Sequence, residues 1–191
     1  MRRIRPWFMF CRVYVREIGP APAVSQASDG LMIRRATRDE LLVAAKANPK
    51  QLSAEFVDEA LANGQFCVGA FDGSRIVSWT WACFDTAPHG DGLCVKVEAP
   101  YEYGYKSLTL PEFRGQGVIG RVILARDQLC YQLGCTHIVG FVETHNYPSI
   151  NTSKHLGSRR VGYAGYVKFF GRAYPFRTPG VVGHSFRFVR A

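Results

Sequence analysis

The sequence predicts an α/β or α+β fold in which helices cover the faces of a mixed β-sheet. Three observations support this. The chain has 191 residues, enough for one domain with a sizeable core. Strand-like and helix-like segments follow one another in the order strand, helix, helix, three strands, helix, strand, helix and strand. Such an order lets each helix bury its apolar face against the sheet.

An amino-terminal strand and a linker precede the main domain. Phe8–Ile18 is rich in aromatic and β-branched residues, which favour a strand. Residues 19–30 are mostly small and have no periodic pattern, as is typical of a linker. A second strand is expected at Met32–Ala36. We therefore expect residues 1–30 to form an extra strand and linker, and residues 31–191 to form the main domain.

Two capped helices follow. Thr37 and Glu40 have the spacing of a capping box, which predicts a helix that starts at Arg38 and ends near Ala47. Ser53 is placed to cap a second helix, and Asn63-Gly64 supplies its left-handed end. Both helices therefore have local start signals.

A hairpin and a further strand come next. Asp72-Gly73 between two apolar runs predicts a hairpin of Phe66–Phe71 and Arg75–Phe84. Residues 85–95 have the composition of a loop, and Tyr103–Leu110 is expected to form the next strand.

The last third of the chain alternates helices and strands. Apolar residues recur at helical spacing from Val118 to Leu133, which predicts the third helix. His137–Glu143 is a short apolar strand, and Tyr147–Leu156 has the pattern of a fourth helix. Residues 158–191 alternate aromatic and basic side chains, which predicts one or two strands with a proline-containing loop at 175–180.

Composition excludes several classes of protein. With 47% hydrophobic and 20% charged residues, the chain is neither disordered nor collagen-like, and it has no apolar run long enough to span a membrane. The six cysteines include no Cys-x-x-Cys pair, which favours reduced core thiols over a zinc site. The apolar stretch at the start is too short for a signal peptide. We therefore expect a cytoplasmic protein with no metal and no membrane contact.

The formal charge of +9 is concentrated at the two ends of the chain. Residues 1–20 carry a net charge of +4, residues 21–153 of −3, and residues 154–191 of +8 with no acidic residue. Such asymmetry indicates an anionic partner. A solvated basic face, a site for a phosphorylated cofactor, and a nucleic-acid or membrane surface all fit it.

The segment Pro111–Gly120 carries the most informative motif. It reads Pro-Glu-Phe-Arg-Gly-Gln-Gly-Val-Ile-Gly and lies between a strand and an amphipathic helix. Glycines at a helix entry allow positive φ and close approach of a ligand to the backbone. The free amides and the helix dipole favour a phosphate, and Arg114 adds a positive charge. A tight turn without a ligand fits the same residues, and neither the P-loop nor the dinucleotide-binding pattern is present.

This segment resembles the cofactor loop of the GNAT superfamily of acyl-CoA-dependent N-acyltransferases. The family pattern, Arg/Gln-x-x-Gly-x-Gly/Ala, follows the fourth strand and opens the third helix. Leu108–Gly117 matches it up to the last position, where Ile119 stands in place of Gly or Ala. Downstream, Phe141–Ile150 and Lys154–Gly157 are similar to the fifth strand, the Asn-containing turn and the fourth helix of the family.

The resemblance implies a fold, a cofactor and its binding residues. The sheet would be mixed and mostly antiparallel, with helices on both faces and with its fourth and fifth strands splayed apart at a bulge. Acetyl-CoA would be the acyl donor. Backbone groups of Leu108 and Leu110 would pair with the pantetheine, which Asn146 would face, and amides from Gln116 to Gly120 would bind the pyrophosphate. The implied cofactor-binding residues are Leu108, Thr109, Leu110, Arg114, Gly115, Gln116, Gly117, Val118, Ile119, Gly120, Asn146 and Ser149.

The implied reaction is direct attack of a neutral primary amine on the thioester, which needs a base and an acid. The candidate bases are Glu143, at the carboxyl end of its strand, and Glu102 together with the tyrosines that follow it. Tyr105 shares a strand face with Tyr103 and is a further catalytic candidate. The family often has a Tyr acid on the fourth helix where this chain has Ser153, so the general acid stays open. Surface, capping or core roles fit these side chains equally well.

Three functions stay open from the sequence. The first is an N-acetyltransferase acting on a small-molecule or peptide amine. The second is an acyltransferase with a longer acyl-CoA or an acidic carrier protein as donor, its chain held by aromatic side chains, namely Trp79, Trp81, Phe169 and Phe170. The third is a nucleic-acid-binding module that uses the basic, aromatic tail at 159–190, although no named nucleic-acid motif is present. The leading strand and the tail could also serve a homodimer.

Overall fold

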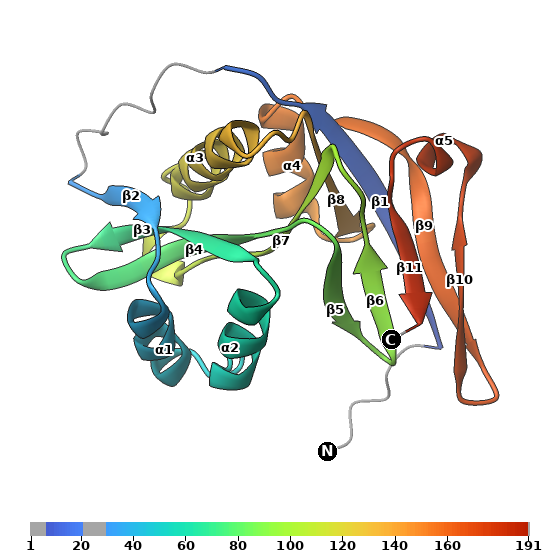
Figure 1. Ribbon diagram of the computed structural model, residues 1–191, viewed down its shortest axis with the longest axis horizontal. Helices are drawn as coiled ribbons and strands as arrows, with labels where there is room; N and C mark the ends of the chain where they lie inside the picture. The colour runs from blue at the N-terminus through green and yellow to red at the C-terminus, as the bar shows by residue number, and fades with distance from the viewer. Residues whose placement is uncertain (1–6, 21–29, 191) are drawn as a thin grey trace. The chain divides into compact units, whose positions relative to one another are not determined.

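The computed structural model describes residues 7–20 and 30–190, which divide into two compact units (Figure 1). We call them the α3 unit and the α4 unit after their main helices. The α3 unit comprises Ile18–Phe84 and Tyr103–Thr136, and the α4 unit comprises Met1–Glu17, Asp85–Glu102 and His137–Ala191, so far as these are described. Both units combine antiparallel strands with helices, which confirms the predicted α+β class. The predicted splay of the fourth and fifth strands stays a prediction.

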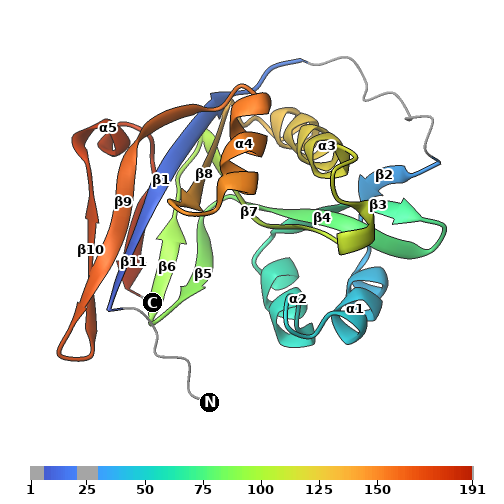
Figure 2. The ribbon, with the colours of Figure 1, turned by 180° about the vertical axis from the view of Figure 1, so that it is seen from behind.

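The α3 unit is a four-stranded antiparallel sheet between helices, with the strand order β7-β4-β3-β2. Its strands are β2 (Met32–Arg35), β3 (Phe66–Asp72), β4 (Arg75–Cys83) and, from Tyr103 onward, β7 (Tyr101–Thr109). Its helices are α1 (Arg38–Ala47), α2 (Ala54–Ala62) and α3 (Val118–Gln132). Helices α1 and α2 lie on one face of the sheet and α3 on the other (Figures 1 and 2). Because both faces are covered, β3 and β4 are buried along almost their whole length.

Helices α1 and α2 begin at the predicted caps. The Thr37 hydroxyl accepts the amide of Glu40 at 3.4 Å, and the Glu40 carboxylate accepts the amide of Thr37 at 2.9 Å, so the capping box is confirmed. Ser53 caps α2 by accepting the amide of Phe56 at 3.2 Å. Arg34 on β2 pairs with Glu40 at 2.5 Å. The Arg34 guanidinium and, less strongly, the cap lower the pKa of Glu40 to about 2.

Glu40→Gln is expected to destabilise the fold by about 1 kcal/mol at pH 7. Glutamine still accepts the Thr37 amide but carries no charge to pair with Arg34. Because the folded-state pKa lies below the usual 4.5, the carboxylate stabilises the fold above pH 4.5, and this stabilisation is lost as the pH falls toward 2. Urea unfolding at pH 7 and pH 3 should therefore show a smaller difference between wild type and variant at pH 3. An equal difference at both pH values would contradict the assigned role of the Arg34 pair.

The α4 unit contains two sets of antiparallel strands, ordered β10-β9-β1-β8 and β11-β6-β5. The first set is β1 (Phe8–Glu17), β8 (His137–Glu143), β9 (Arg159–Phe169) and β10 (Arg172–Arg177). The second set is β5 (Thr86–Gly90), β6 (Leu93–Lys96) and β11 (Arg187–Arg190), and the helices are α4 (Tyr147–His155) and α5 (Pro179–Val182). Figures 1 and 2 show α4 on one side of the β1–β8 pair and the second set of strands on the other.

The amino-terminal strand β1 is an interior strand of the α4 unit. Val13 pairs with Phe141 of β8 on one side and with Gly162 of β9 on the other. The Cys11 thiol is buried and donates to the Ala164 carbonyl at 3.1 Å, and burial raises the pKa of Cys11 to about 12. The leading strand is thus part of the core of this unit. The predicted division at residue 30 stays a prediction, and residues 21–29 of the expected linker lie outside the described residues.

Two loops predicted from the sequence are wrong. Residues 85–95 include β5 and most of β6, which are joined by Asp91-Gly92 with φ of +58° and +69°. This is the geometry of a tight hairpin turn. The predicted start of the second loop, at residue 175, is too early, because β10 continues through Pro175 to Arg177. Since β10 is an edge strand, a proline without an amide donor is tolerated there.

Two further expectations concern the cysteines and membranes. All six cysteines are free thiols, and burial raises the pKa of Cys67. Over residues 7–20 and 30–190, no helix combines the length and apolarity needed to cross a bilayer.

Candidate functional site

The glycine-rich loop between β7 and α3 turns through two glycines in left-handed conformations. A 3₁₀ turn at Pro111–Phe113 leads into Arg114. Gly115 and Gly117 are both left-handed, with φ of +77° and +70°. A Cβ built at either glycine meets no atom of the described structure within 4 Å. The glycines therefore supply the turn and leave open space that a ligand can enter.

The amides at the start of α3 are donors without backbone partners. Gly117 is the N-cap, and its carbonyl accepts the amides of Gly120 at 3.1 Å and Arg121 at 3.4 Å. In the described part of the chain, no backbone carbonyl accepts the four amides from Gln116 to Ile119. These four groups lie at the positive end of the helix dipole, where an anion is stabilised. The Gly120 amide, predicted as a further donor, is engaged within the first turn of the helix.

Side chains hold the loop in place and keep it basic. Arg114 donates through Nε to the Thr109 carbonyl at 3.0 Å, and Gln116 donates through Nε2 to the Glu112 carbonyl at 3.1 Å. The carboxylate of Glu112 pairs with Arg75 at 2.7 Å. The negative charge of Glu112 is therefore neutralised by Arg75, which lies outside the loop. The positive charge of Arg114 is available to a ligand.

Strand β7 carries a bulge directly before the loop. Trp81 pairs with Tyr105 and Trp79 with Leu108, so β7 has one residue more than β4 over this interval. Lys106 lies in the bulge with φ of +48°. The Leu108 carbonyl accepts the Ser78 hydroxyl at 3.0 Å, and Leu110 bonds through its amide to Val77 at 2.9 Å. The Leu108 carbonyl and the Leu110 amide, both predicted to face the pantetheine, are therefore already engaged in internal hydrogen bonds.

The two tyrosines ahead of the bulge share one strand face, as predicted. The Tyr103 and Tyr105 rings are stacked with centroids 5.1 Å apart, and both are buried. The Tyr105 hydroxyl donates to Gln65, a buried residue that the sequence analysis did not single out. Burial raises the pKa of Tyr105, so its hydroxyl stays protonated at neutral pH.

Helix α3 also contains a buried charged pair, Arg126 and Asp127, that was not predicted from the sequence. Arg126 and Asp127 are 3% exposed and pair at 2.8 Å, and Arg126 also donates to Thr80 at 3.0 Å. A Cβ at Gly104 would lie 2.2 Å from the Arg126 guanidinium, so any larger residue there would displace this side chain. The signal was available, because Arg126 lies four and eight residues after the buried Val122 and Val118 and therefore on the same helix face.

The candidate base Glu143 ends β8 and is exposed. Its carboxylate lies 3.1 Å from Nε2 of His145 in the following turn. The second candidate, Glu102, is fully buried in the α4 unit. An exposed carboxylate beside an imidazole can exchange protons with solvent, whereas a fully buried one cannot do so directly. Of the two carboxylates, only Glu143 can therefore exchange protons with solvent directly, and the catalytic role of either residue stays a prediction.

The turn after β8 is built around the predicted asparagine. Asn146 caps α4 by accepting the amide of Ser149 at 3.3 Å. Ser153, at the position where the family often has a Tyr acid, donates its hydroxyl to the Ser149 carbonyl at 3.0 Å. The side-chain amide of Asn146 and the hydroxyl of Ser149 are the groups that could take up the predicted cofactor contacts.

The predicted site residues fall in both units. Leu108 to Gly120 and Tyr105 belong to the α3 unit, whereas Glu102, Glu143, Asn146 and Ser149 belong to the α4 unit. The joint site that combines them stays a prediction. Among the described residues, no three His, Cys, Asp or Glu side chains cluster as metal ligands would.

Comparison with known proteins finds similarity at the level of structure. No protein-family profile and no curated protein sequence matches the chain. A putative acetyltransferase of the GNAT family from Novosphingobium aromaticivorans matches with a TM-score of 0.58 and 17% identity, over 85% of this chain and 63% of that one. A GCN5-related N-acetyltransferase from Kribbella flavida matches with a TM-score of 0.55 and 12% identity, over 91% of this chain and 60% of that one. An aminoglycoside N-acetyltransferase in complex with CoA matches with a TM-score of 0.53 and 20% identity, over 66% of this chain and 90% of that one.

These identities establish the fold and leave the activity to be tested. The chain spans 63% of the length of the Novosphingobium protein and 52% of a Drosophila protein that also matches. The glycine loop between β7 and α3 and the Asn146 turn between β8 and α4 occur in the order that the sequence motifs imply. The resemblance inferred from those motifs is thus confirmed at the level of the fold: the chain has the fold of the GNAT N-acetyltransferases.

Proposed function

We propose that the protein is an N-acetyltransferase that transfers the acetyl group of acetyl-CoA to a primary amine. The observation that carries the proposal is the set of four amides from Gln116 to Ile119 beside open space at Gly115 and Gly117. A pyrophosphate is an anion that such a loop accommodates. The shared fold with GNAT acetyltransferases supports the reaction class.

Along the chain, the end of β7 and the glycine loop would contact successive parts of CoA. Arg114 and the helix amides would hold the pyrophosphate. Leu108 and Thr109, on the strand that leads to the loop, would pair with the pantetheine through their backbone groups. Leu110 would contribute less, because its amide donates to Val77 and its carbonyl accepts the Phe113 amide at 3.0 Å. The carbonyls of Leu108 and Thr109 each already accept one bond, from the Ser78 hydroxyl and from Nε of Arg114, so a bond to the pantetheine would be their second.

Proton removal from the amine is assigned to Glu143. A primary amine is mostly protonated at neutral pH and becomes a nucleophile only after it loses a proton. Glu143 is exposed at the end of β8 and is paired with His145, which can pass the proton to solvent. Glu102 is the second candidate and is disfavoured by its burial.

The leaving thiolate needs a proton, and Tyr105 is the candidate donor. Its hydroxyl stays protonated because burial raises its pKa, and it would leave its bond to Gln65 to protonate the thiolate. Ser153, which donates its hydroxyl to Ser149, is less suited to this role, since an aliphatic hydroxyl is a weaker acid than a phenol.

Release of free thiol from acetyl-CoA in the presence of primary amines tests the proposed reaction. We expect release that depends on one class of amine, among small molecules and peptide amino termini, with the acetylated amine detected by mass spectrometry. Release with no dependence on any amine would contradict the proposal. Release from longer acyl-CoA donors alone would favour the alternative donor.

One observation argues against the longer acyl donor. Trp79 and Trp81, expected to line an acyl chain, are 1% and 0% exposed in the core of the α3 unit. Phe169 and Phe170 are instead exposed at the turn that joins β9 to β10. The aromatic set therefore does not form one lining. The cytoplasmic location and the homodimer stay predictions.

A further inference from the structure

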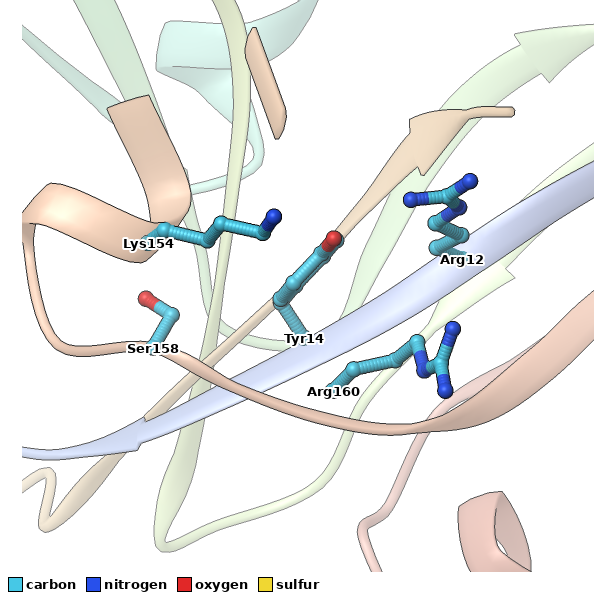
Figure 3. Close-up of a pocket in the computed structure, with 5 residues that line it drawn as sticks. All are labelled: Arg12, Tyr14, Lys154, Ser158 and Arg160. Atoms are coloured by element: carbon cyan, nitrogen blue, oxygen red, sulfur yellow. The ribbon is translucent and has the colours of Figure 1, made fainter. Parts of the chain in front are cut away.

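A pocket in the α4 unit brings together basic side chains from both ends of the chain. It has a volume of about 330 Å³ and is lined by Arg12, Tyr14, Lys154, Ser158 and Arg160. Figure 3 shows Arg12 and Tyr14 on β1, Arg160 on β9, Lys154 at the end of α4 and Ser158 in the turn that follows. The pocket lies wholly within this unit and shares no residue with the glycine loop.

Backbone pairing fixes the residues of the pocket relative to one another. Tyr14 and Arg160 are directly paired across β1 and β9, and Arg12 is two residues from Tyr14 and so on the same sheet face. At the end of α4, Gly157 adopts φ of +76°, and the amides of Gly157 and Ser158 bond to the carbonyls of Lys154 and Ser153 at 2.9 Å. This turn satisfies the helix carbonyls and holds Lys154 and Ser158 over the sheet.

The pocket contains positive charge without a compensating acid. Its lining has three cations and two hydroxyls and no carboxylate. None of the ion pairs between described residues involves Arg12, Lys154 or Arg160. Three like charges gathered in one pocket repel one another, so an anion bound there would relieve an unfavourable interaction.

One donor in this pocket is buried without a partner. Nε of Arg12 is inaccessible to solvent and makes no hydrogen bond to any described residue. Because Nε is enclosed by the protein, a ligand in the pocket would be met by the terminal nitrogens of Arg12. Arg160 uses one nitrogen to donate to the Tyr163 hydroxyl at 3.0 Å, which orients the guanidinium and leaves its other donors available.

We propose that this pocket binds the phosphate group of a phosphate monoester. Two guanidinium groups, an ammonium and two hydroxyls line this one pocket and offer many donors, which suits the three free oxygens and the double negative charge of a phosphate monoester better than a carboxylate. A volume of about 330 Å³ exceeds what a lone phosphate fills and is in the range of small-molecule sites. A single convergent pocket also fits one phosphate better than the extended groove that a nucleic-acid strand needs.

The phosphate could come from CoA, which carries a 3′-phosphate monoester, or from a separate phosphorylated molecule. Calorimetric titration of the full chain with inorganic phosphate, CoA and 3′-dephospho-CoA at constant ionic strength distinguishes the two. The test variant is Arg160→Gln. The matched control is Arg159→Gln, which removes the same charge from the adjacent exposed residue, on the opposite sheet face.

Arg160→Gln should weaken binding of a phosphate monoester by at least about tenfold, since it removes charge-assisted hydrogen bonds, whereas Arg159→Gln should leave it near the wild-type value. If CoA is the source, Arg160→Gln weakens CoA and spares dephospho-CoA. If the ligand is a separate molecule, Arg160→Gln weakens inorganic phosphate and spares CoA. Lys154→Gln should follow Arg160→Gln in either case.

Equal effects of Arg159→Gln and Arg160→Gln on every probe, or no effect of either, would overturn the proposal. Binding of a single-stranded oligonucleotide that both variants weaken alike would indicate a diffuse basic surface and would also overturn it. The result is separable from the proposed acetyl transfer, because dephospho-CoA lacks the 3′-phosphate and its binding reports on the proposed CoA site without that group.

Discussion

Replacing Gly117 by Trp is expected to abolish acetyl-CoA binding while the protein stays folded. Gly117 is the N-cap of α3, and the space where its side chain would lie is open. An indole there would occupy the approach to the amides from Gln116 to Ile119. Loss of several charge-assisted hydrogen bonds should lower the affinity by at least about 100-fold. Isothermal titration calorimetry measures the affinity, and circular dichroism checks the fold.

Gly64→Trp is the matched control for this experiment. Gly64 has φ of +72°, close to the +70° of Gly117, and a Cβ there also meets no described atom within 4 Å. Both variants therefore bear a similar backbone strain of about 1 kcal/mol. Gly64 follows α2, away from the loop in the chain. Gly64→Trp should bind acetyl-CoA like wild type, and a Gly117→Trp protein that binds equally well would refute the assigned loop.

Glu143→Gln is expected to lower kcat by about 100-fold or more, with little change in acetyl-CoA affinity. Glutamine keeps the size of the side chain and can still contact His145, but it cannot accept a proton from the amine. The loss should shrink at high pH, where more of the amine is already neutral. Steady-state rates over a range of pH, with saturating acetyl-CoA, measure the effect.

Glu17→Gln serves as the control for the loss of a carboxylate. Glu17 is exposed and lies at the opposite end of the β1–β8 pair, where it is paired with His137, while Cys11 is paired with Glu143. Its replacement should leave kcat unchanged. Wild-type turnover by Glu143→Gln at every pH, or a larger loss with His145→Gln, would exclude Glu143 as the base.

The parts of the fold that follow from local chemistry were predictable. The caps at Thr37 and Ser53 depend only on residues three positions apart, and the structure shows both. Gly64 and Gly157 end their helices in left-handed conformations as expected. These signals act within one helical turn, so a single sequence contains all the information they need.

Pairings between distant segments were not predictable in the same way. Strand β6 pairs with β11 near the end of the chain, through partners such as Val95 and Phe188. Residues 85–95 contain Pro88, Gly90 and Gly92, which made the segment resemble a loop. The Asp91-Gly92 turn carried the same hairpin signal as Asp72-Gly73, but the flanking residues lack a long apolar run. Tertiary pairing decided the outcome there.

The candidate site shows the same division. The backbone of the glycine loop could be predicted, because Gly115 and Gly117 are needed for its left-handed turns. The contacts that position other groups could not, since Tyr105 meets Gln65 across forty residues of sequence. The sequence likewise showed that both ends of the chain are basic, but it did not show where these charges lie in the fold. The pairing of β1 with β9 places Arg12 and Arg160 in one pocket.

Calorimetric titration of the wild-type chain with acetyl-CoA at low and high salt tests the central claim most directly. We expect one site per chain with micromolar affinity, weakened by salt because phosphates are bound by amides and arginines. Absence of binding at low salt would contradict the assigned cofactor loop and the acetyltransferase activity proposed from it.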